Sequence, residues 1–147
     1  MGRSEGQMVS ARDESLRSGE VARLAGVNIE TLRYYERRGL LPQPPRRPSG
    51  YRMYPIATVE RVRFIKRAQQ LGFSLREIQQ LLQLEEAAWA SCEEVCAITE
   101  RKIQEIAEKI RDLQKIRRAL QSLLRQCPRV APISKCPILA SLKNAKP

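Results

Sequence analysis

The sequence contains no histidine, which removes the commonest protein ligand of zinc and every catalytic arrangement that uses an imidazole base. It also lacks a nucleophile–base pair, a Gly-rich phosphate loop and a carboxylate dyad, so we do not expect an enzyme. No run of 18 consecutive apolar residues is present, and the N-terminal stretch MGRSEGQMVSARDES has no apolar signal-peptide core. We therefore expect a soluble, cytoplasmic protein.

Acidic residues are scarce relative to basic ones, with 16 against 27 and a net charge of +11 over 147 residues. Such an excess is typical of proteins that bind a polyanion, either nucleic acid or an anionic membrane surface. Residues 15–84 hold 13 basic and 5 acidic side chains, a net charge of +8. We therefore assign the polyanion partner to this N-terminal half.

Residues 16–39 have the pattern of two short helices joined by a tight turn. Apolar residues recur at helical spacing on both sides of the turn: Val21, Leu24, Ala25, Leu32 and Tyr35. Gly26 suits the end of the first helix and Asn28 the start of the second, which stops at Gly39. In a helix-turn-helix unit the second helix enters the DNA major groove. A small helical domain without a DNA-binding role is the alternative.

The second helix carries polar side chains outside its apolar stripe that could reach bases and phosphates. These are Asn28, Glu30, Thr31, Arg33, Tyr34, Arg37 and Arg38. Residues 42–55 then follow, too rich in proline for a helix, with a turn at Ser49-Gly50 and a short strand at 51–54. Arg46, Arg47, Arg52, Tyr51 and Tyr54 predict that this segment, here called the wing, lies along a sugar–phosphate backbone. An ordinary surface loop is the alternative.

Two further helices are expected after the wing. The first, over residues 56–71, has its apolar positions at helical spacing: Val59, Val62, Phe64, Ile65 and Ala68. Gly72 ends it, and Ser74 with Glu77 forms a capping box that opens the next helix. The inner face of that helix consists of Leu75, Ile78, Leu81 and Leu82. We therefore predict a disordered lead at 1–14, a DNA-binding domain at 15–84 and a hinge at 85–90.

A long heptad-patterned helix is predicted over residues 91–126. Its a and d positions are Thr99, Ile103, Ile106, Ile110, Leu113, Arg117, Leu120 and Leu124. About four heptads favour a dimerising coiled coil over a helix packed on its own domain. An unbroken helix of this length would separate Cys92 and Cys127 by roughly 50 Å. With an antiparallel partner, Cys92 of one chain would meet Cys127 and Cys136 of the other, giving two equivalent sites.

Residues 127–147 are predicted to form a metal-binding loop and a C-terminal tail. In CPRVAPISKC, two prolines favour a stiff loop that holds Cys127 and Cys136 at a fixed separation. Four cysteines in a reducing compartment indicate thiols or metal ligands, and three sulfurs suit a thiophilic ion. Cys96, one turn after Cys92, is either a small buried residue or a fourth ligand, which would favour tetrahedral zinc or cadmium.

Several stretches together resemble the MerR family of winged-helix transcription regulators. They are GEVARLAGVNIETLRYYERRGLL, GYRMY and FIKRAQQLGFSLREIQQLL, followed by the long helix, and the resemblance covers about residues 16–142. It implies a mainly α fold: an N-terminal winged helix-turn-helix module, a long antiparallel coiled-coil dimerisation helix and a short C-terminal metal-binding loop. It also implies a homodimer on double-stranded promoter DNA, with RNA polymerase as a partner and no membrane partner.

The cysteine spacing, with SCEE at Cys92 and CPILASL at Cys136, resembles the mercury(II)-responsive members of that family. This implies Hg(II) as effector, held by Cys92 of one protomer and by Cys127 and Cys136 of the other. The ion would convert a repressor into an activator of a mercuric-resistance promoter by distorting its DNA. Cd(II), Pb(II) or Zn(II) as effector, a thiol redox sensor and a metal buffer are the alternatives. The expected DNA-binding residues are Asn28, Thr31, Arg33, Tyr34, Arg37, Arg38, Tyr51 and Arg52.

Overall fold

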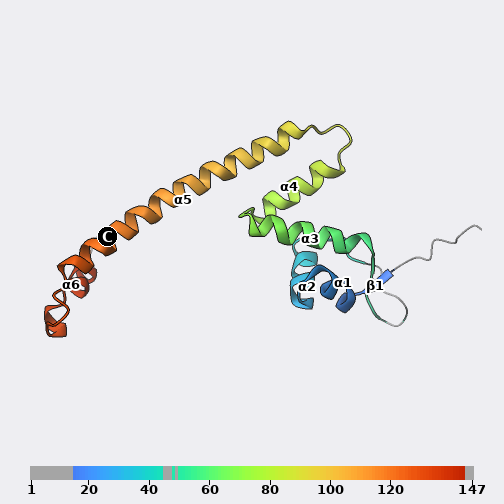
Figure 1. Cartoon of the computed structure of the whole chain (residues 1–147). Coiled ribbons are helices and arrows are strands. Elements are labelled where there is room, and N and C mark those ends of the chain that lie inside the picture. The colour runs from blue at the N-terminus through green and yellow to red at the C-terminus, as the bar shows by residue number, and fades with distance from the viewer. Residues whose placement is uncertain (1–14, 45–47, 49, 145–147) are drawn as a thin grey trace, which may run out of the picture. The chain divides into compact units, whose positions relative to one another are not determined.

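The computed structural model describes residues 15–44, 48 and 50–144, which form two compact units divided between Val95 and Cys96 (Figure 1). The predicted lead at 1–14 and the wing residues Arg46, Arg47 and Ser49 lie outside the described residues. In the N-terminal unit, helix α1 packs against α2 and α3, and α3 packs against α4. Each unit is described by itself below.

The predicted helix-turn-helix is confirmed as α1 (Ser18–Ala25) followed by α2 (Ile29–Arg37). Gly26 ends α1 with a φ of 71°, a left-handed conformation that costs glycine little because it has no Cβ. The side chain of Asn28 caps α2, because its Oδ1 accepts a hydrogen bond from the backbone N–H of Thr31 at 2.7 Å. Local capping chemistry therefore fixes the turn between the two helices.

The wing is anchored by a two-stranded antiparallel sheet of β1 (Ser15–Arg17) and β2 (Met53–Pro55). Leu16 lies opposite Tyr54 in this pairing, and Tyr54 is fully buried. The strand near Tyr54 was predicted, although the structure begins it at Met53. Its partner β1 was not, since three residues are too few to display an alternating pattern.

Helices α3 (Ala57–Gln70) and α4 (Leu75–Glu86) complete the N-terminal unit. The predicted capping box is present: the backbone N–H of Glu77 donates to the Ser74 hydroxyl, and that of Ser74 donates to the Glu77 carboxylate. The fully buried core side chains include Val21, Leu32, Tyr54, Val62, Ile65 and Ile78. The prediction was wrong for Leu24 and Phe64, which are exposed because they lie at the edges of their helices' apolar stripes.

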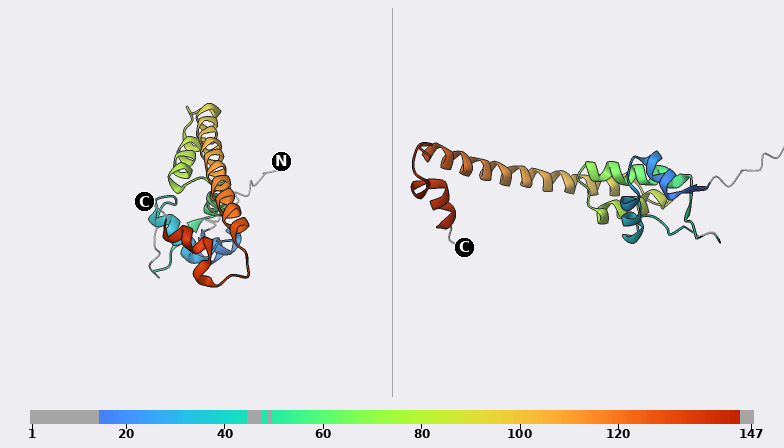
Figure 2. Two further views of the ribbon diagram at one scale, coloured as in Figure 1. Left: turned by 90° about the vertical axis from the view of Figure 1, so that its left-hand side faces the viewer. Right: turned by 90° about the horizontal axis from the view of Figure 1, so that it is seen from below.

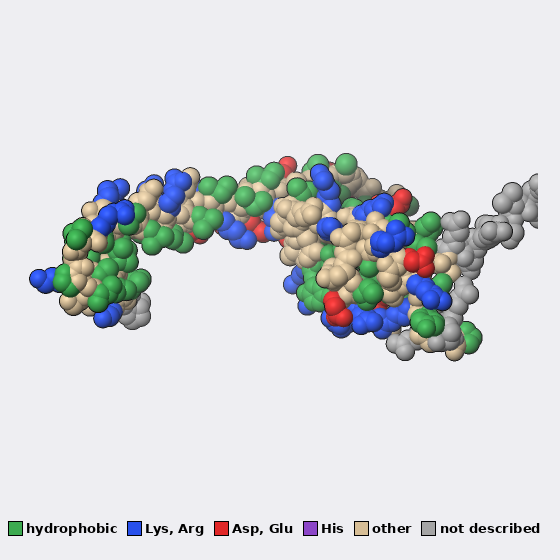
Figure 3. All heavy atoms as spheres, turned by 60° about the horizontal axis from the view of Figure 1, so that its bottom comes forward, with side chains coloured by type: hydrophobic (Ala, Val, Ile, Leu, Met, Phe, Trp, Pro, Cys, Tyr) green, Lys and Arg blue, Asp and Glu red, His purple; other side chains and the backbone are tan. Residues whose placement is uncertain are grey.

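Helix α5 (Cys92–Gln126) is one continuous helix of 35 residues, as predicted from the heptads (Figure 2). Ser91 and Glu94 cap its start: the Ser91 backbone N–H and hydroxyl both donate to the Glu94 carboxylate, at 3.0 and 2.7 Å. The apolar a and d side chains from Ile103 to Leu124 are exposed, and Figure 3 shows hydrophobic side chains along this helix. A single chain therefore leaves this apolar stripe uncovered.

After α5 the chain turns through a 3₁₀ turn, η1 (Ile133–Lys135), into a short helix, α6 (Pro137–Lys143). The loop between Cys127 and Cys136 was predicted, but α6 was expected to be part of a C-terminal tail. Pro137 stands in its first turn, where proline is tolerated because no intrahelical N–H is needed there. Among the described residues, no helix combines the length and the apolar character needed to cross a membrane.

Candidate nucleic-acid interface and metal-binding thiols

Helix α2 presents one face to the core and one to the outside. Leu32, Tyr35 and Glu36 are buried, whereas Arg33, Tyr34, Arg37 and Arg38 are exposed. The side chain of Arg33 is 53% exposed and lies 3.5 Å from Glu30, a weak surface pair that leaves the guanidinium accessible. These four exposed side chains, which the sequence predicts to face DNA, are therefore accessible to a ligand.

Two of the predicted DNA-binding residues have a structural task in the isolated chain. Besides accepting the backbone bond described above, the Oδ1 of Asn28 accepts a hydrogen bond from the Thr31 hydroxyl at 2.9 Å. This uses the carbonyl side of Asn28 and the hydroxyl proton of Thr31 to stabilise the start of α2. The amide N–H groups of Asn28 are the part of this pair best suited to an external acceptor.

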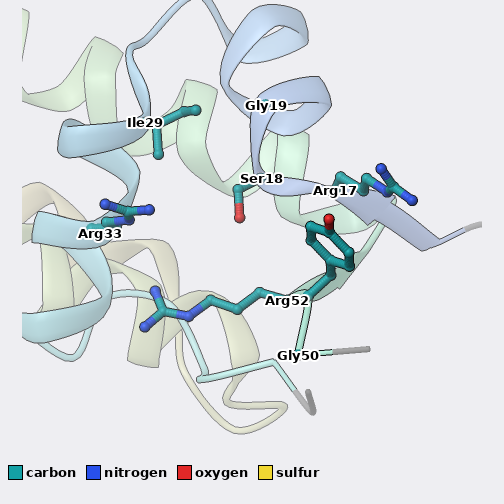
Figure 4. Close-up of a pocket in the computed structure, with 8 residues that line it drawn as sticks. Arg17, Ser18, Gly19, Ile29, Arg33, Gly50 and Arg52 are labelled. Atoms are coloured by element: carbon teal, nitrogen blue, oxygen red, sulfur yellow. The ribbon is translucent and has the colours of Figure 1, made fainter. Parts of the chain in front are cut away.

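An open hollow of about 460 Å³ lies where the wing, the start of α1 and α2 come together (Figure 4). It is lined by Arg17, Ser18, Gly19, Ile29, Arg33, Gly50, Tyr51 and Arg52. Three of these side chains are basic, and no acidic side chain belongs to the described residues that line it. Figure 4 shows Arg33 and Arg52 entering from α2 and from the wing. Such a hollow is suited to an anionic group such as a phosphate.

Sequence reasoning missed Arg17 and Ser18 at this hollow. The guanidinium carbon of Arg17 lies 4.7 Å from the centre of the Tyr51 ring, a cation–π arrangement that connects β1 to the wing. Ser18 is the first residue of α1, where backbone N–H groups lack partners within the helix. The sequence signal that could have identified these two residues was a basic residue directly before a predicted helix start.

A buried carboxylate joins the wing to helix α2. Glu36, only 7% exposed, accepts a hydrogen bond and ion pair from Arg52 at 2.8 Å and a hydrogen bond from the Tyr54 hydroxyl. Arg52 was predicted as a phosphate contact, and the structure adds a second role. Its ion pair fixes the wing relative to the helix that the sequence predicts to enter the groove.

Several basic residues of α3 hold the unit together instead of remaining free. Arg63 donates to the Leu24 carbonyl at 2.7 Å, and Lys66 donates to the Gly26 carbonyl at 2.6 Å. Both carbonyls belong to the end of α1, where cations complement the helix dipole. Arg61 donates to the Leu40 carbonyl at 2.8 Å. Counting charges therefore overstates how many basic side chains are free to contact a polyanion directly.

Tyr35, buried beside α3, is a structural residue of α2. Burial raises the pKa of its phenol above the usual 10.0, and its hydroxyl donates to Gln69 at 2.5 Å. The neutral phenol is thereby maintained, and the bond connects α2 to α3.

The four cysteines form no disulfide and lie at or near the two ends of α5. Cys92 and Cys96 are exposed, and Cys127 and Cys136 are partly buried. Cys96 is exposed in the single chain, and its burial against a partner helix stays a prediction. Within residues 15–44, 48 and 50–144, no three Cys, Asp, Glu or His side chains come together.

The excess of basic charge is not confined to the N-terminal half, so net charge by itself does not locate the polyanion partner. Residues 96–147 contain 12 basic and 4 acidic side chains, also a net of +8. Residues 85–95 contain four acidic side chains and no basic one. The charge of the chain is thus distributed in blocks, with an acidic block between two basic ones.

Comparisons with known proteins cover nearly the whole chain. Residues 16–85 match the family described as MerR HTH family regulatory protein, and residues 59–123 match the one described as MerR, DNA binding. The mercuric resistance operon regulatory protein of Bacillus cereus is 48% identical over 126 residues, which cover 86% of this chain and 96% of that protein.

Two solved structures are also similar. One is the transcriptional regulator MerR from Bacillus megaterium MB1 in complex with mercury(II), with 44% identity and a TM-score of 0.67, covering 88% of this chain and 100% of that one. The other is the regulator PbrR691 from Ralstonia metallidurans CH34 in complex with lead(II), with 35% identity and a TM-score of 0.78, covering 86% and 98%. This chain, with its winged helix-turn-helix unit and long C-terminal helix, belongs to the MerR family of DNA-binding transcription regulators.

Proposed function

We propose that the protein is a Hg(II)-responsive regulator that represses a mercuric-resistance promoter without the metal and activates it when Hg(II) binds. The single observation that carries this proposal is the location of the thiols near both ends of one 35-residue helix whose apolar stripe is uncovered. The mercuric resistance regulators to which the chain is similar support the choice of metal. No catalytic activity is expected of a protein of this class.

The apolar stripe of α5 supports a homodimer. Ile103 and Leu113 are 60% and 65% exposed in the single chain, and the stripe continues to Leu124. Burying one such side chain contributes about 1.5–3 kcal/mol, so a stripe of this length is enough to hold two chains together. Arg117 interrupts the stripe, and a polar residue at such a position is a known means of specifying register.

The blocks of charge favour an antiparallel arrangement of the two helices. From Leu113 to Pro147 the chain contains eight basic side chains and no acidic one. An antiparallel partner brings this basic block beside the acidic block at residues 85–95, whereas a parallel partner places like charges together. Attraction between exposed blocks is weakened by salt, so it affects orientation more than affinity.

The metal site follows from the antiparallel dimer. A 35-residue helix is about 50 Å long, so Cys92 cannot share an ion with Cys127 of its own chain. In the dimer, Cys92 meets the partner's Cys127 and the partner's Cys136. Three thiolates without an imidazole form a donor set that fits a soft ion, and the bound ion would supply a bridge between the two chains. Because that bridge stabilises one arrangement of the dimer over another, it shifts the equilibrium between repressor and activator.

The hollow between the wing and α2 would hold a DNA phosphate. Arg33, Tyr51 and Arg52 come from both sides of it, and Arg37 and Arg38 extend the same exposed face of α2. Asn28 and Tyr34 are the proposed contacts to base edges, with Thr31 beside them. Two such modules on a two-fold dimer would bind a palindromic promoter, with RNA polymerase as the partner that responds to the distorted DNA. We expect the protein to bind promoter DNA in the cytoplasm.

The decisive experiment compares promoter activity with and without Hg(II) for the native chain and for Cys127→Ser. Operator DNA is first selected by the protein from a pool, and transcription is then measured in a purified system. We expect Cys127→Ser to keep its operator affinity and to lose activation by Hg(II). Ser134→Ala, in the same loop, is the matched control and should remain inducible. Activation of Cys127→Ser by Hg(II) would contradict the proposal, as would activation of the native chain only by Cd(II), Pb(II), Zn(II) or an oxidant.

A further inference from the structure

Cys92 and Cys96 lie one turn apart on the first two turns of α5, and both are exposed. When the spacing of the apolar stripe is continued backward from Thr99, both cysteines fall on it, so they share one face of the helix. Side chains four residues apart on a helix have Cβ atoms about 5–6 Å apart. The fold therefore provides a pair of accessible thiols within a single chain.

This spacing matches the geometry of a soft ion held by two thiolates. Two metal–sulfur bonds of about 2.3 Å, the length found for zinc thiolates, put the sulfurs about 4.6 Å apart when the ion lies between them. Staggered rotamers of the two cysteines can bring their sulfurs to that distance without movement of the helix backbone. Zinc in protein sites takes four ligands, so the pair alone does not satisfy it.

Of the two acidic side chains in the first turn of α5, Glu94 is engaged in capping the helix. The carboxylate of Glu94 accepts hydrogen bonds from the backbone N–H and hydroxyl of Ser91. It is therefore committed to capping the helix and does not add a hard oxygen ligand between the two thiols. Two thiolates as the main donors of the pair favour a soft ion.

We propose that Cys92 and Cys96 form a two-thiolate site that captures a soft divalent ion within one chain, before the partner chain takes part. The choice of Hg(II) as the ion rests on the function proposed above, but the site itself does not. Capture forms two metal–sulfur bonds, breaks the two bonds to the monothiols that carried the ion, and passes the two cysteine protons to the released thiolates. The ion is then transferred to the three-thiolate site between the two chains. In this step the partner's Cys127 and the partner's Cys136 lose their protons and bind the ion as thiolates. The bond between the ion and Cys96 breaks, and Cys96 takes one proton back.

The test uses the full chain with Cys127→Ser and Cys136→Ser, which retains only the proposed pair. It is dialysed against HgCl₂ in excess monothiol, which outcompetes a single cysteine but not a two-thiolate chelate. We expect one mercury per chain and the loss of both reactive thiols. The matched control adds Cys96→Ser and Ala97→Cys, which keeps two thiols but moves the second by about 100° around the helix. Its affinity for Hg(II) should fall at least about 100-fold, and equal binding by both variants would overturn the proposal.

A second measurement keeps the proposal testable if the serine variant loses helical structure, as judged by circular dichroism. Cys96→Ser alone, with Cys127 and Cys136 intact, should take up Hg(II) from its monothiol complex at least about ten times more slowly than the native chain. An unchanged rate overturns the capture site. Both measurements are separate from the function proposed above because they involve no promoter, and the Cys96→Ser variant also keeps Cys92, Cys127 and Cys136 in place.

Discussion

The guanidinium of Arg52 lies 2.8 Å from the carboxylate of Glu36, so the wing is connected directly to helix α2. Tyr54, from strand β2, donates its hydroxyl proton to the other oxygen of the same carboxylate. One buried acid therefore holds two residues of the wing in place. The orientation of the wing relative to α2 depends on this side chain.

Replacing Glu36 with alanine should destabilise the N-terminal unit. The change leaves the buried hydroxyl of Tyr54 and the partly buried guanidinium of Arg52 without their acceptor. Loss of a buried charged acceptor costs about 2–3 kcal/mol, which urea unfolding would measure. The control is Glu30→Ala, because Glu30 is 77% exposed and its pair with Arg33 contributes at most about 1 kcal/mol. Equal stability of the two variants would show that the buried network does not hold the wing.

Arg33→Ala should weaken DNA binding through loss of a phosphate contact. Its guanidinium is exposed beside the hollow and forms only a long pair with Glu30. Loss of one phosphate contact should reduce the slope of log affinity against log salt by about 1, with a similar effect on different DNA sequences. Fluorescence anisotropy at several salt concentrations provides the measurement.

The matched control for Arg33 is Arg76→Ala, which removes the same charge from an exposed position on α4 away from the hollow. We expect its salt slope to equal that of the native chain. If both variants reduce the slope of log affinity against log salt by the same amount, the effect comes from net charge and the hollow is not a phosphate site.

The parts of the fold that local sequence signals specify were predictable. Gly26 and Asn28 define the turn between α1 and α2, and the capping box of Ser74 and Glu77 starts α4. Each of these signals involves residues that are only a few positions apart in the sequence. The heptad pattern was also sufficient to predict α5 within one residue of its observed start.

Contacts between residues distant in sequence were not predictable in the same way. The pairing of Arg52 with Glu36 spans 16 residues, and the bond from Lys66 to the Gly26 carbonyl spans 40. Composition counts these basic residues as free charge, whereas the fold uses them to complete helix ends and to fix the wing. Burial of Cys96 likewise depends on what packs over the helix in a dimer, so it stays a prediction.

The cap at the start of α5 includes a titratable group, the carboxylate of Glu94. Hydrogen bonds from the Ser91 side chain and backbone lower the pKa of the exposed Glu94 carboxylate below its usual 4.5. A lowered pKa means that the ionised form favours the folded helix, so this contribution is present above pH 4.5 and is lost as the pH falls through the folded-state pKa. Ser91→Ala should raise the pKa of Glu94 toward 4.5, as measured by NMR titration of its carboxyl carbon. An unchanged pKa would mean that Ser91 does not cap the helix in solution.

Leu113→Glu should dissociate the dimer that the exposed stripe of α5 is proposed to form. The side chain is 65% exposed in the single chain, and its burial against a partner contributes about 1.5–3 kcal/mol. Because the change occurs in both chains, the expected loss is about 3–6 kcal/mol, or about 10²–10⁴-fold in the dimer dissociation constant. Analytical ultracentrifugation at several concentrations would measure it. Gln114→Glu adds the same charge beside the stripe and should leave the dimer intact. Equal dissociation constants for the two variants would exclude this stripe as the dimer interface, because a charge buried within an apolar seam must cost more than one on its solvated flank.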